Sequence, residues 1–148
     1  MKKKILLTGG TGLIGKNLNK TLLSKYQIKS IGSEIDLKNE IKVRNLFLNF
    51  KPDILIHLAA KVGGIQANIN NKLTFYLDNT LINTNVLKFA EIVNVKYIFA
   101  MGTGCAYPKK YENKNLFEDM FLDGVPEETN NAYAYAKKKF ISSFKILI

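Results

Sequence analysis

The sequence predicts an α/β fold built on a doubly wound, mostly parallel sheet. Short apolar runs alternate with amphipathic stretches along the chain, and glycines follow the ends of several apolar runs. The composition is that of a soluble globular protein, with 47% hydrophobic and 23% charged residues. Because 148 residues suffice for one domain of ordinary size, we expect a single domain over residues 1–148.

The expected elements alternate in type from the first residues onward. Lys4–Thr8 is a short apolar run typical of a strand buried on both faces, and helical spacing of apolar residues begins at Leu13. The further expected strands are Tyr26–Ile31, Ile54–Leu58 and Tyr97–Met101, and the further expected helices are Glu40–Phe50, Leu73–Val93 and Ala132–Phe140, with a loop over Pro108–Asn131. Strand–helix alternation requires crossover connections, which predicts a parallel sheet with helices on both faces.

The net charge of +10 raises the question of nucleic-acid binding. The positive charge is almost all lysine, with Arg44 the single arginine, and it is spread along the chain. Readers of nucleic acid favour arginine for bidentate contacts, often beside stacking aromatics. We therefore expect no nucleic-acid partner.

The sequence also predicts a cytoplasmic protein without a membrane span. The longest apolar runs, such as Ile54–Ala60, stop far short of the roughly 20 residues that cross a bilayer. The basic start of the chain leads directly into glycines instead of a signal-peptide core. Cys105 is the single cysteine, so we expect a reducing compartment, no disulfide and no metal site.

The glycine-rich turn Thr8–Gly15 is the strongest single feature of the sequence. It has the spacing of a dinucleotide fingerprint and lies between the first expected strand and helix. Such glycines allow a tight turn and a close approach of backbone to a pyrophosphate, while the helix N-terminus offers free N–H groups. This predicts a Rossmann-type dinucleotide site, with an ordinary glycine turn as the alternative. The residues expected to bind the cofactor here are Gly9, Thr11, Gly12, Leu13, Ile14 and Gly15.

The adenosine end of that site is less clear in the sequence. Sites that bind NAD in preference to NADP have a carboxylate at the end of the second strand, where this chain has Gly32 and Ser33. Glu34 is near enough to serve NAD(H), whereas Ser33 with neighbouring lysines suits a 2′-phosphate. NADP(H) is therefore favoured and NAD(H) stays open. We expect Asp36 and Leu37 to meet the adenine, with a solvated turn as the alternative.

A second pair of residues, Tyr133 and Lys137, is four apart on an expected helix, so both side chains lie on one face. A tyrosine hydroxyl serves as a proton donor near neutral pH when a neighbouring ammonium stabilises the tyrosinate. The pair therefore predicts an acid site, and the alternative is an unremarkable helix-face pair. Lys138 and Lys139 are expected to be solvated.

These features, taken in order, resemble a known enzyme group. Thr8–Gly15, His57–Ala60, Gly102–Pro108 and Tyr133–Lys137 are similar to motifs of the extended short-chain dehydrogenase/reductase superfamily that modifies nucleotide sugars. Within it, Ala60–Asn68, Cys105–Lys109 and Pro126–Asn130 resemble the GDP-L-fucose synthase branch. The resemblance implies a homodimeric enzyme that reduces a GDP-4-keto-6-deoxyhexose with NADPH, with 3,5-epimerisation as a possible companion step.

The resemblance also implies residue roles. Tyr133 becomes the general acid, Lys137 lowers its pKa and holds the nicotinamide ribose, Thr103 polarises the keto group, and Cys105 is the acid/base for epimerisation. The alternative for Cys105 is a small buried residue, and His57 is expected to be a core residue. Leu58, Ala59, Ala60 and Asn79 are implied to contact the cofactor, and Lys61, Val62, Gly63, Gly64 and Asn68 to border the sugar, with a structural Gly-Gly turn as the alternative for that loop.

Two departures from this family qualify the expectation. Family members are much longer, and the histidine that partners the cysteine in epimerisation lies beyond the tyrosine, where this chain ends in the apolar tail Phe144–Ile148. We therefore expect a truncated chain that lacks most of the substrate domain. The alternatives are a 4-epimerase or dehydratase of another nucleotide sugar, and a noncatalytic dinucleotide-binding domain.

Overall fold

A computed structural model describes residues 2–111 and 114–144, and the chain divides into two compact units. The first unit comprises Met1–Ala60 together with Ile82–Met101, and the second comprises Lys61–Leu81 and the chain from Gly102 onward. The end of the expected apolar tail, residues 145–148, lies outside the described residues.

The first unit contains a four-stranded parallel sheet with the order β2-β1-β3-β4. The strands are β1 (Lys4–Thr8), β2 (Gln27–Ile31), β3 (Ile54–His57) and β4 (Tyr97–Ala100). Leu6 of β1 is fully buried and pairs in register with Lys29 of β2 and Leu55 of β3. The expected parallel sheet is confirmed, and each strand ends within one residue of its predicted bounds.

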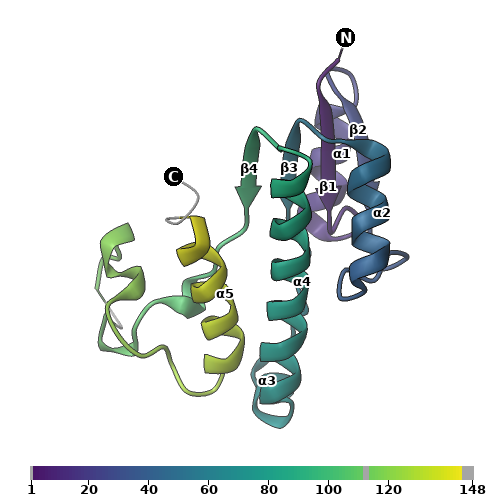
Figure 1. Cartoon of the computed structure of the whole chain (residues 1–148). Coiled ribbons are helices and arrows are strands. Elements are labelled where there is room, and N and C mark those ends of the chain that lie inside the picture. The colour runs from purple at the N-terminus through teal and green to yellow at the C-terminus, as the bar shows by residue number, and fades with distance from the viewer. Residues whose placement is uncertain (1, 112–113, 145–148) are drawn as a thin grey trace. The chain divides into compact units, whose positions relative to one another are not determined.

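Helices cover both faces of this sheet, as predicted. The helices are α1 (Leu13–Leu22), α2 (Glu40–Phe50) and α4 (Lys72–Ile92), whose last eleven residues belong to the first unit. Figure 1 shows α1 on one face and α2 with the end of α4 on the other. Leu6 and Leu55 pack there with Phe47 of α2 and Val86 of α4 in one apolar cluster. Burial of such side chains, about 1.5–3 kcal/mol each, holds the helices to the sheet.

Three hydrogen-bonded polar side chains are buried in the first unit. His57 is fully buried, with Nδ1 2.6 Å from Thr8 Oγ1 and Nε2 3.1 Å from Asn83 Oδ1. These bonds join β1, β3 and α4. They also supply the polar partners that a buried imidazole needs. The expectation that His57 is a core residue is confirmed.

The described part of the second unit consists of three α-helical segments and three short 3₁₀ turns. It contains α3 (Ile65–Asn70), the first ten residues of α4, three 3₁₀ turns and α5 (Asn131–Phe144). Helix α5 begins one residue before the predicted start and runs four residues beyond the predicted end. Helix α3 was not predicted, because six residues are too short for a helical period to stand out.

The expected loop over Pro108–Asn131 is more ordered than predicted. Two 3₁₀ turns, η2 (Lys109–Tyr111) and η3 (Glu118–Leu122), interrupt it, after η1 (Gly104–Ala106). An isolated antiparallel bridge pairs Pro108 with Pro126, and Lys109 N–H donates to Val125 O at 3.0 Å. Across the described residues, no helix has the length and apolar character needed to span a bilayer.

Candidate active site

At two positions of the glycine-rich turn, Gly9 and Gly15, neighbouring backbone atoms leave no space for a side chain. Gly9 has a φ of +73°, which favours glycine, and a Cβ there would lie 2.8 Å from Ala59 N. A Cβ on Gly15 would lie 2.6 Å from Gly10 Cα, so the start of α1 packs directly on the turn. The two glycines are therefore required by the close packing of strand, turn and helix.

The N-terminus of α1 is open in the way a bound anion needs. Gly12 precedes the helix and supplies no side-chain cap, and the first turn carries no acidic residue. Unpaired N–H groups at a helix start attract phosphate oxygens. Leu13 beside them is 83% exposed, and Ile14 is also exposed. The uncapped start of α1 therefore has the kind of N–H donors that an anion needs.

The end of β2 lies against the same turn. A Cβ on Gly32 would come within 2.7 Å of Thr11 Oγ1, which places Thr11 beside the position expected for the adenosine ribose. Ser33 and Glu34 are exposed. Gly32 N–H donates to Glu34 Oε1 at 2.7 Å, and this bond holds the pKa of the Glu34 carboxyl below its usual value. Both candidate groups for the ribose are thus present in one short turn.

Leu37 and Asp36, expected near the adenine, differ in burial. Asp36 is exposed, whereas Leu37 is only 5% exposed and packs in the core of the first unit. Asn85 Nδ2 donates to Leu37 O at 3.0 Å. The Leu37 side chain is therefore a core element, which the sequence prediction did not anticipate.

The residues after β3 approach the glycine turn through the backbone. Leu58 N–H donates to Thr8 O at 3.1 Å, and Ala59 N–H donates to Thr8 Oγ1 at 3.3 Å. Together with the 2.8 Å approach to Gly9, these bonds place Leu58 and Ala59 beside the turn, and Ala60 follows them in the chain.

A cavity of about 210 Å³ in the second unit gathers most of the predicted substrate and catalytic residues. Its lining is Val62, Gly63, Gly64, Ile65, Asn68, Cys105, Asn130 and Tyr133. Four of the five predicted sugar-bordering residues thus meet two predicted catalytic residues. They come from the loop before α3, from α3 itself, from η1 and from the start of α5.

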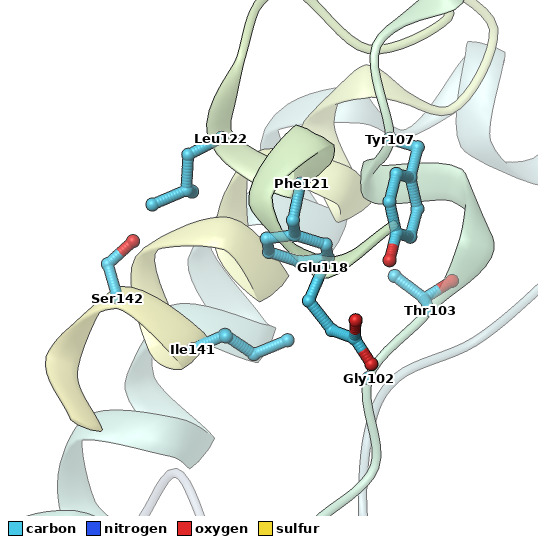
Figure 2. A pocket seen from close by; sticks show the side chains of 8 residues that line it. All are labelled: Gly102, Thr103, Tyr107, Glu118, Phe121, Leu122, Ile141 and Ser142. Atoms are coloured by element: carbon cyan, nitrogen blue, oxygen red, sulfur yellow. The ribbon is translucent and has the colours of Figure 1, made fainter. Parts of the chain in front are cut away.

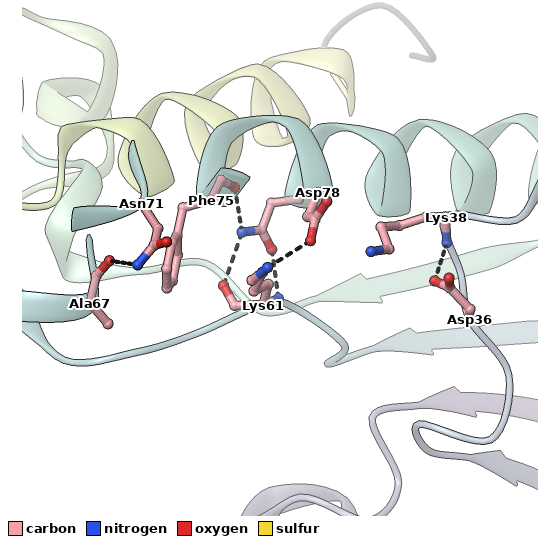
Figure 3. Close-up of polar contacts among 8 residues, drawn as sticks. Asp36, Lys38, Lys61, Ala67, Asn71, Phe75 and Asp78 are labelled. Atoms are coloured by element: carbon pink, nitrogen blue, oxygen red, sulfur yellow. Dashed lines mark hydrogen bonds and ion pairs between the residues drawn. The ribbon is translucent and has the colours of Figure 1, made fainter. Parts of the chain in front are cut away.

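Lys61, the fifth predicted sugar-bordering residue, does not line this cavity. Its ammonium forms an ion pair with Asp78 at 2.9 Å, as Figure 3 shows. The Lys61 side chain is therefore engaged with α4 and its role is structural in this geometry.

Tyr133 is held in a small network with two other predicted catalytic residues. Burial raises the pKa of the Tyr133 hydroxyl, the negative charge of Cys105 in its ionised form raises it further, and a hydrogen bond with the Thr103 side chain opposes both effects. Cys105 N–H donates to Thr103 Oγ1 at 3.3 Å, so the backbone fixes this hydroxyl. Tyr133 accordingly keeps its proton at neutral pH, the state an acid needs.

Cys105 itself is exposed. The alternative expectation, a small buried residue after a strand, is therefore wrong. The thiol follows Thr103 at the first turn of η1 and remains accessible to a ligand in the cavity.

Lys137 lies one turn from Tyr133 on α5, as the spacing predicted. It is almost completely buried, and its Nζ lies 5.9 Å from the centre of the Tyr133 ring. Burial lowers the pKa of Lys137 below its usual value. The pKa of Tyr133 is nevertheless raised, with burial as the main cause, so the expected lowering of that pKa by Lys137 is not seen in this structure.

Lys138 departs from the prediction of a solvated side chain. It is only 8% exposed, and its Nζ donates to Gly124 O at 2.6 Å. The backbone between η3 and α5 provides the acceptor, so Lys138 ties that segment to α5. Lys139 is exposed, as expected.

Asn79, expected to contact the cofactor, is fully buried and bonded to the backbone. Its Oδ1 accepts from Lys61 N–H at 2.8 Å, and its Nδ2 donates to Lys61 O at 2.9 Å and to Phe75 O at 2.8 Å. These bonds make Asn79 a structural anchor for the loop after β3.

A larger cavity of about 380 Å³ also lies in the second unit, and Figure 2 shows its lining. Tyr107 and Phe121 meet edge to face with ring centres 5.3 Å apart, and Ile141 and Leu122 add to the apolar wall. Among the predicted catalytic residues, Thr103 alone lines it. The smaller cavity therefore matches the predicted chemistry better.

Two residues of the smaller cavity, Ile65 and Asn130, were missed as site residues. Ile65 opens α3, the helix that the sequence did not predict. Asn130 directly precedes α5, and a helix-capping residue beside a predicted catalytic tyrosine was a signal that the sequence offered.

Two curated proteins that are similar to this chain are described as synthases of GDP-linked sugars. The chain is 40% identical over 136 residues to the GDP-L-colitose synthase of Yersinia pseudotuberculosis, covering 90% of this chain and 44% of that protein. It is 42% identical over 142 residues to a probable GDP-L-fucose synthase of Drosophila melanogaster, covering 92% and 44%. The chain thus spans less than half the length of these curated relatives.

Solved structures confirm the predicted fold class. A GDP-L-fucose synthetase from Naegleria fowleri bound to NADP matches with a TM-score of 0.88 and 32% identity, covering 98% of this chain and 44% of that one. A GDP-mannoheptose C4 reductase from Campylobacter jejuni with NADP bound matches with a TM-score of 0.89 and 26% identity, covering 98% and 48%. The predicted resemblance to GDP-L-fucose synthases is confirmed. Residues 5–145 match the NAD dependent epimerase/dehydratase family, and the chain belongs to that family.

Proposed function

We propose that this chain carries the dinucleotide-binding and catalytic part of an NADPH-dependent enzyme that reduces the 4-keto group of a GDP-4-keto-6-deoxyhexose. The observation that carries the proposal is the cavity in which Cys105 and Tyr133 meet the loop of Val62, Gly63 and Gly64. Relatives described as GDP-L-fucose synthases support the substrate class.

The proposed acid is Tyr133. Its raised pKa keeps the phenol protonated at neutral pH, so it holds a proton to give to the substrate's keto oxygen. Thr103, which hydrogen-bonds Tyr133, is positioned to donate to the same oxygen. Lys137 stabilises the tyrosinate left behind. NADPH, when bound, would supply the hydride for C4 of the sugar.

The glycine turn is proposed to bind the cofactor's diphosphate. Gly12 starts α1 without a side-chain cap, and Leu13 is exposed beside it. Two structural relatives carry NADP, which favours NADP(H) over NAD(H) for this chain. Ser33 is the proposed contact to the 2′-phosphate, with Asp36 and the backbone of Leu37 toward the adenine.

Epimerisation beside the keto group is a second candidate activity. Cys105 is exposed and lines the cavity with Tyr133, which is the placement that proton exchange at a ring carbon needs. A thiolate takes the proton from the carbon next to the carbonyl, and an acid returns a proton to the other face.

The test is to mix the protein with NADPH and GDP-4-keto-6-deoxymannose and to follow the loss of absorbance of the reduced cofactor. Reduction predicts loss of one NADPH for each sugar reduced. Absence of oxidation with this substrate would contradict the proposal. Conversion of another nucleotide sugar without net consumption of NADPH would favour a 4-epimerase or dehydratase, because those reactions are redox-neutral.

Calorimetric titration with NADPH and with NADH completes the test. Tighter binding of NADPH supports Ser33 as the phosphate contact, and tighter binding of NADH supports Glu34. Heat of binding without turnover would reduce the proposal to a noncatalytic dinucleotide-binding domain, and no heat with either cofactor would contradict both.

We also propose that the protein forms a homodimer through α4. Leu73, Leu77 and Leu81 recur every four residues on this helix and are all exposed, which makes an apolar stripe that a second copy can cover. Sedimentation equilibrium should show a dimer that Leu77→Lys converts to a monomer. A monomeric parent chain would contradict this proposal and leave the reductase proposal standing.

A further inference from the structure

Two buried hydrogen-bond acceptors near Cys105 and Tyr133 lack a partner. Among the described residues, four buried side-chain atoms have no hydrogen-bond partner, and two of them are Asn68 Oδ1 and Asn130 Oδ1. Both asparagines line the 210 Å³ cavity. An unpaired buried amide oxygen costs stability, so two around one cavity point to a ligand that pairs with them.

The orientation of the Asn68 amide is fixed by its neighbours. Its Nδ2 donates to Gly63 O at 3.0 Å and to Gly64 O at 3.1 Å, and the residue is only 4% exposed. Both partners are carbonyls, which accept and cannot donate, so the amide nitrogen must face them. The oxygen is therefore the atom left for a ligand.

The Asn130 side chain lacks the hydrogen bond that an asparagine directly before a helix normally makes. It precedes α5, and its backbone oxygen accepts from Ala134 N–H at 3.1 Å. An asparagine at such a position usually accepts a first-turn N–H with its side chain as well. Here Oδ1 makes no such bond although it is buried. The helix start therefore does not account for the buried, unpaired oxygen of Asn130.

The chemistry of the two oxygens selects the part of the substrate that binds. Both are uncharged acceptors, which repel a diphosphate and attract hydroxyl donors. The cavity is also smaller than the roughly 300–1,000 Å³ of pockets that bury a whole drug-sized ligand. It therefore suits a hydroxylated sugar ring better than a nucleotide.

We propose that Asn68 and Asn130 are specificity-determining residues whose amide oxygens accept hydrogen bonds from the two ring hydroxyls, at C2 and C3, of the 4-keto-6-deoxyhexose. This inference rests on the proposed function, because Tyr133 fixes where the keto group lies. A ring that lacks one of these hydroxyls leaves one buried oxygen unpaired and binds about 10- to 100-fold more weakly.

The test compares three ligands by calorimetry without cofactor: GDP-4-keto-6-deoxymannose and its 2-deoxy and 3-deoxy analogues. The parent protein should bind both analogues about 10- to 100-fold more weakly than the complete sugar. Asn130→Ala should abolish the discrimination against one analogue and keep the discrimination against the other. Asn131→Ala, the neighbouring asparagine, is the matched control and should behave like the parent.

Asn130→Ala is the sharper variant, because Asn68→Ala also removes the two bonds to the glycine carbonyls. Its unfolding midpoint should be no lower than that of the parent, which separates lost binding from lost folding. Equal affinity of the parent for all three sugars, or unchanged discrimination in Asn130→Ala, overturns the inference. If either of those results is found and the parent still oxidises NADPH with the complete sugar, this inference alone fails and the proposed function stands. If the parent neither binds nor reduces any of the sugars, the proposed function fails with it.

Discussion

The two units of the chain differ in how they use buried polar side chains. In the first unit, Thr8 and Asn83 each hydrogen-bond the ring of His57, and Asn85 donates to Leu37 O and Lys38 O. In the second unit, Asn68 and Asn130 leave acceptors unpaired beside Cys105 and Tyr133. Asn83 Nδ2 and Thr80 Oγ1 are the other buried side-chain atoms without a hydrogen-bond partner among the described residues, and neither residue lines that cavity.

This contrast separates buried polar side chains that hold the fold together from those that we propose bind a ligand. Bonds between helix and strand in the first unit stabilise the sheet without any ligand. In the second unit the same kind of side chain is positioned at a stability cost of about 1–3 kcal/mol for each unpaired oxygen. Changes in the second unit's cavity should therefore alter activity or binding more than folding.

The largest expected effect is on the rate of Tyr133→Phe. Without the phenol proton, the reduction rate should fall about 100- to 10,000-fold, while NADPH affinity stays within about threefold. Steady-state NADPH oxidation and cofactor titration measure the two quantities. Tyr135→Phe, an exposed neighbour on the same helix, is the control and should retain the parent rate. A Tyr133→Phe rate close to that of the parent would remove Tyr133 from the mechanism.

The next effect concerns the glycine turn of the first unit. In Gly15→Ala the new Cβ meets backbone atoms of Gly10 at 2.6 and 2.8 Å, so the turn must shift away from α1. A shift of about 1 Å should weaken NADPH binding on the order of 100-fold. Calorimetry measures the affinity, with Gly104→Ala as the control, because a Cβ there has no atom within 4 Å. Undiminished binding would place the diphosphate elsewhere.

A third prediction contrasts two asparagines of the second unit. Asn79→Ala removes three hydrogen bonds to Lys61 and Phe75 and should lower the free energy of unfolding by about 2–4 kcal/mol. Asn130→Ala removes no bond of Oδ1 and relieves the cost of burying that oxygen unpaired, so it should not lower the free energy of unfolding and should raise it by up to about 1–3 kcal/mol. Urea denaturation monitored by circular dichroism measures both. Similar losses in the two variants would end the distinction between structural and ligand-directed asparagines.

The smallest effect is on how stability depends on pH. Burial lowers the pKa of Lys137, so between that pKa and the usual 10.5 the unfolded chain binds more protons than the folded one. The free energy of unfolding therefore rises with pH in this window. In Lys137→Met that rise should be smaller, although not absent, because burial also lowers the pKa of Lys138.

Urea denaturation between about pH 7 and pH 9.5 measures the slope below the usual tyrosine titration range. Above that range the raised pKa of Tyr133 acts with the opposite sign, because the folded chain then holds the extra proton. Lys139→Met is the exposed control. A slope in Lys137→Met equal to that of the parent would show that Lys137 does not contribute.

The first unit was predictable because its elements are long enough for periodicity to decide them. The bounds of Lys4–Thr8 and Glu40–Phe50 are as predicted, since a buried strand reads as a continuous apolar run and a covering helix as an amphipathic one. The buried role of His57 followed from its place inside such a run.

The second unit was predictable in its chemistry and less so in its structure. Tyr133 and Lys137 were found from their spacing, whereas α3 is too short to show a period. Lys138 was misjudged because its acceptor, Gly124 O, comes from a segment whose path depends on tertiary contacts. The unpaired oxygen of Asn130 has no sequence signature, because the same residue type usually caps the helix it precedes.

The activity that we propose is hydride transfer to the keto carbon of a GDP-linked sugar, with Tyr133 as the acid. Isotope labelling tests it with NADPH that carries deuterium at the transferred position of the nicotinamide and GDP-4-keto-6-deoxymannose as substrate, followed by nuclear magnetic resonance of the isolated sugar. We expect deuterium at C4 of the product and NADP⁺ without deuterium. A sugar without deuterium at C4, or a cofactor that keeps the label, would contradict it.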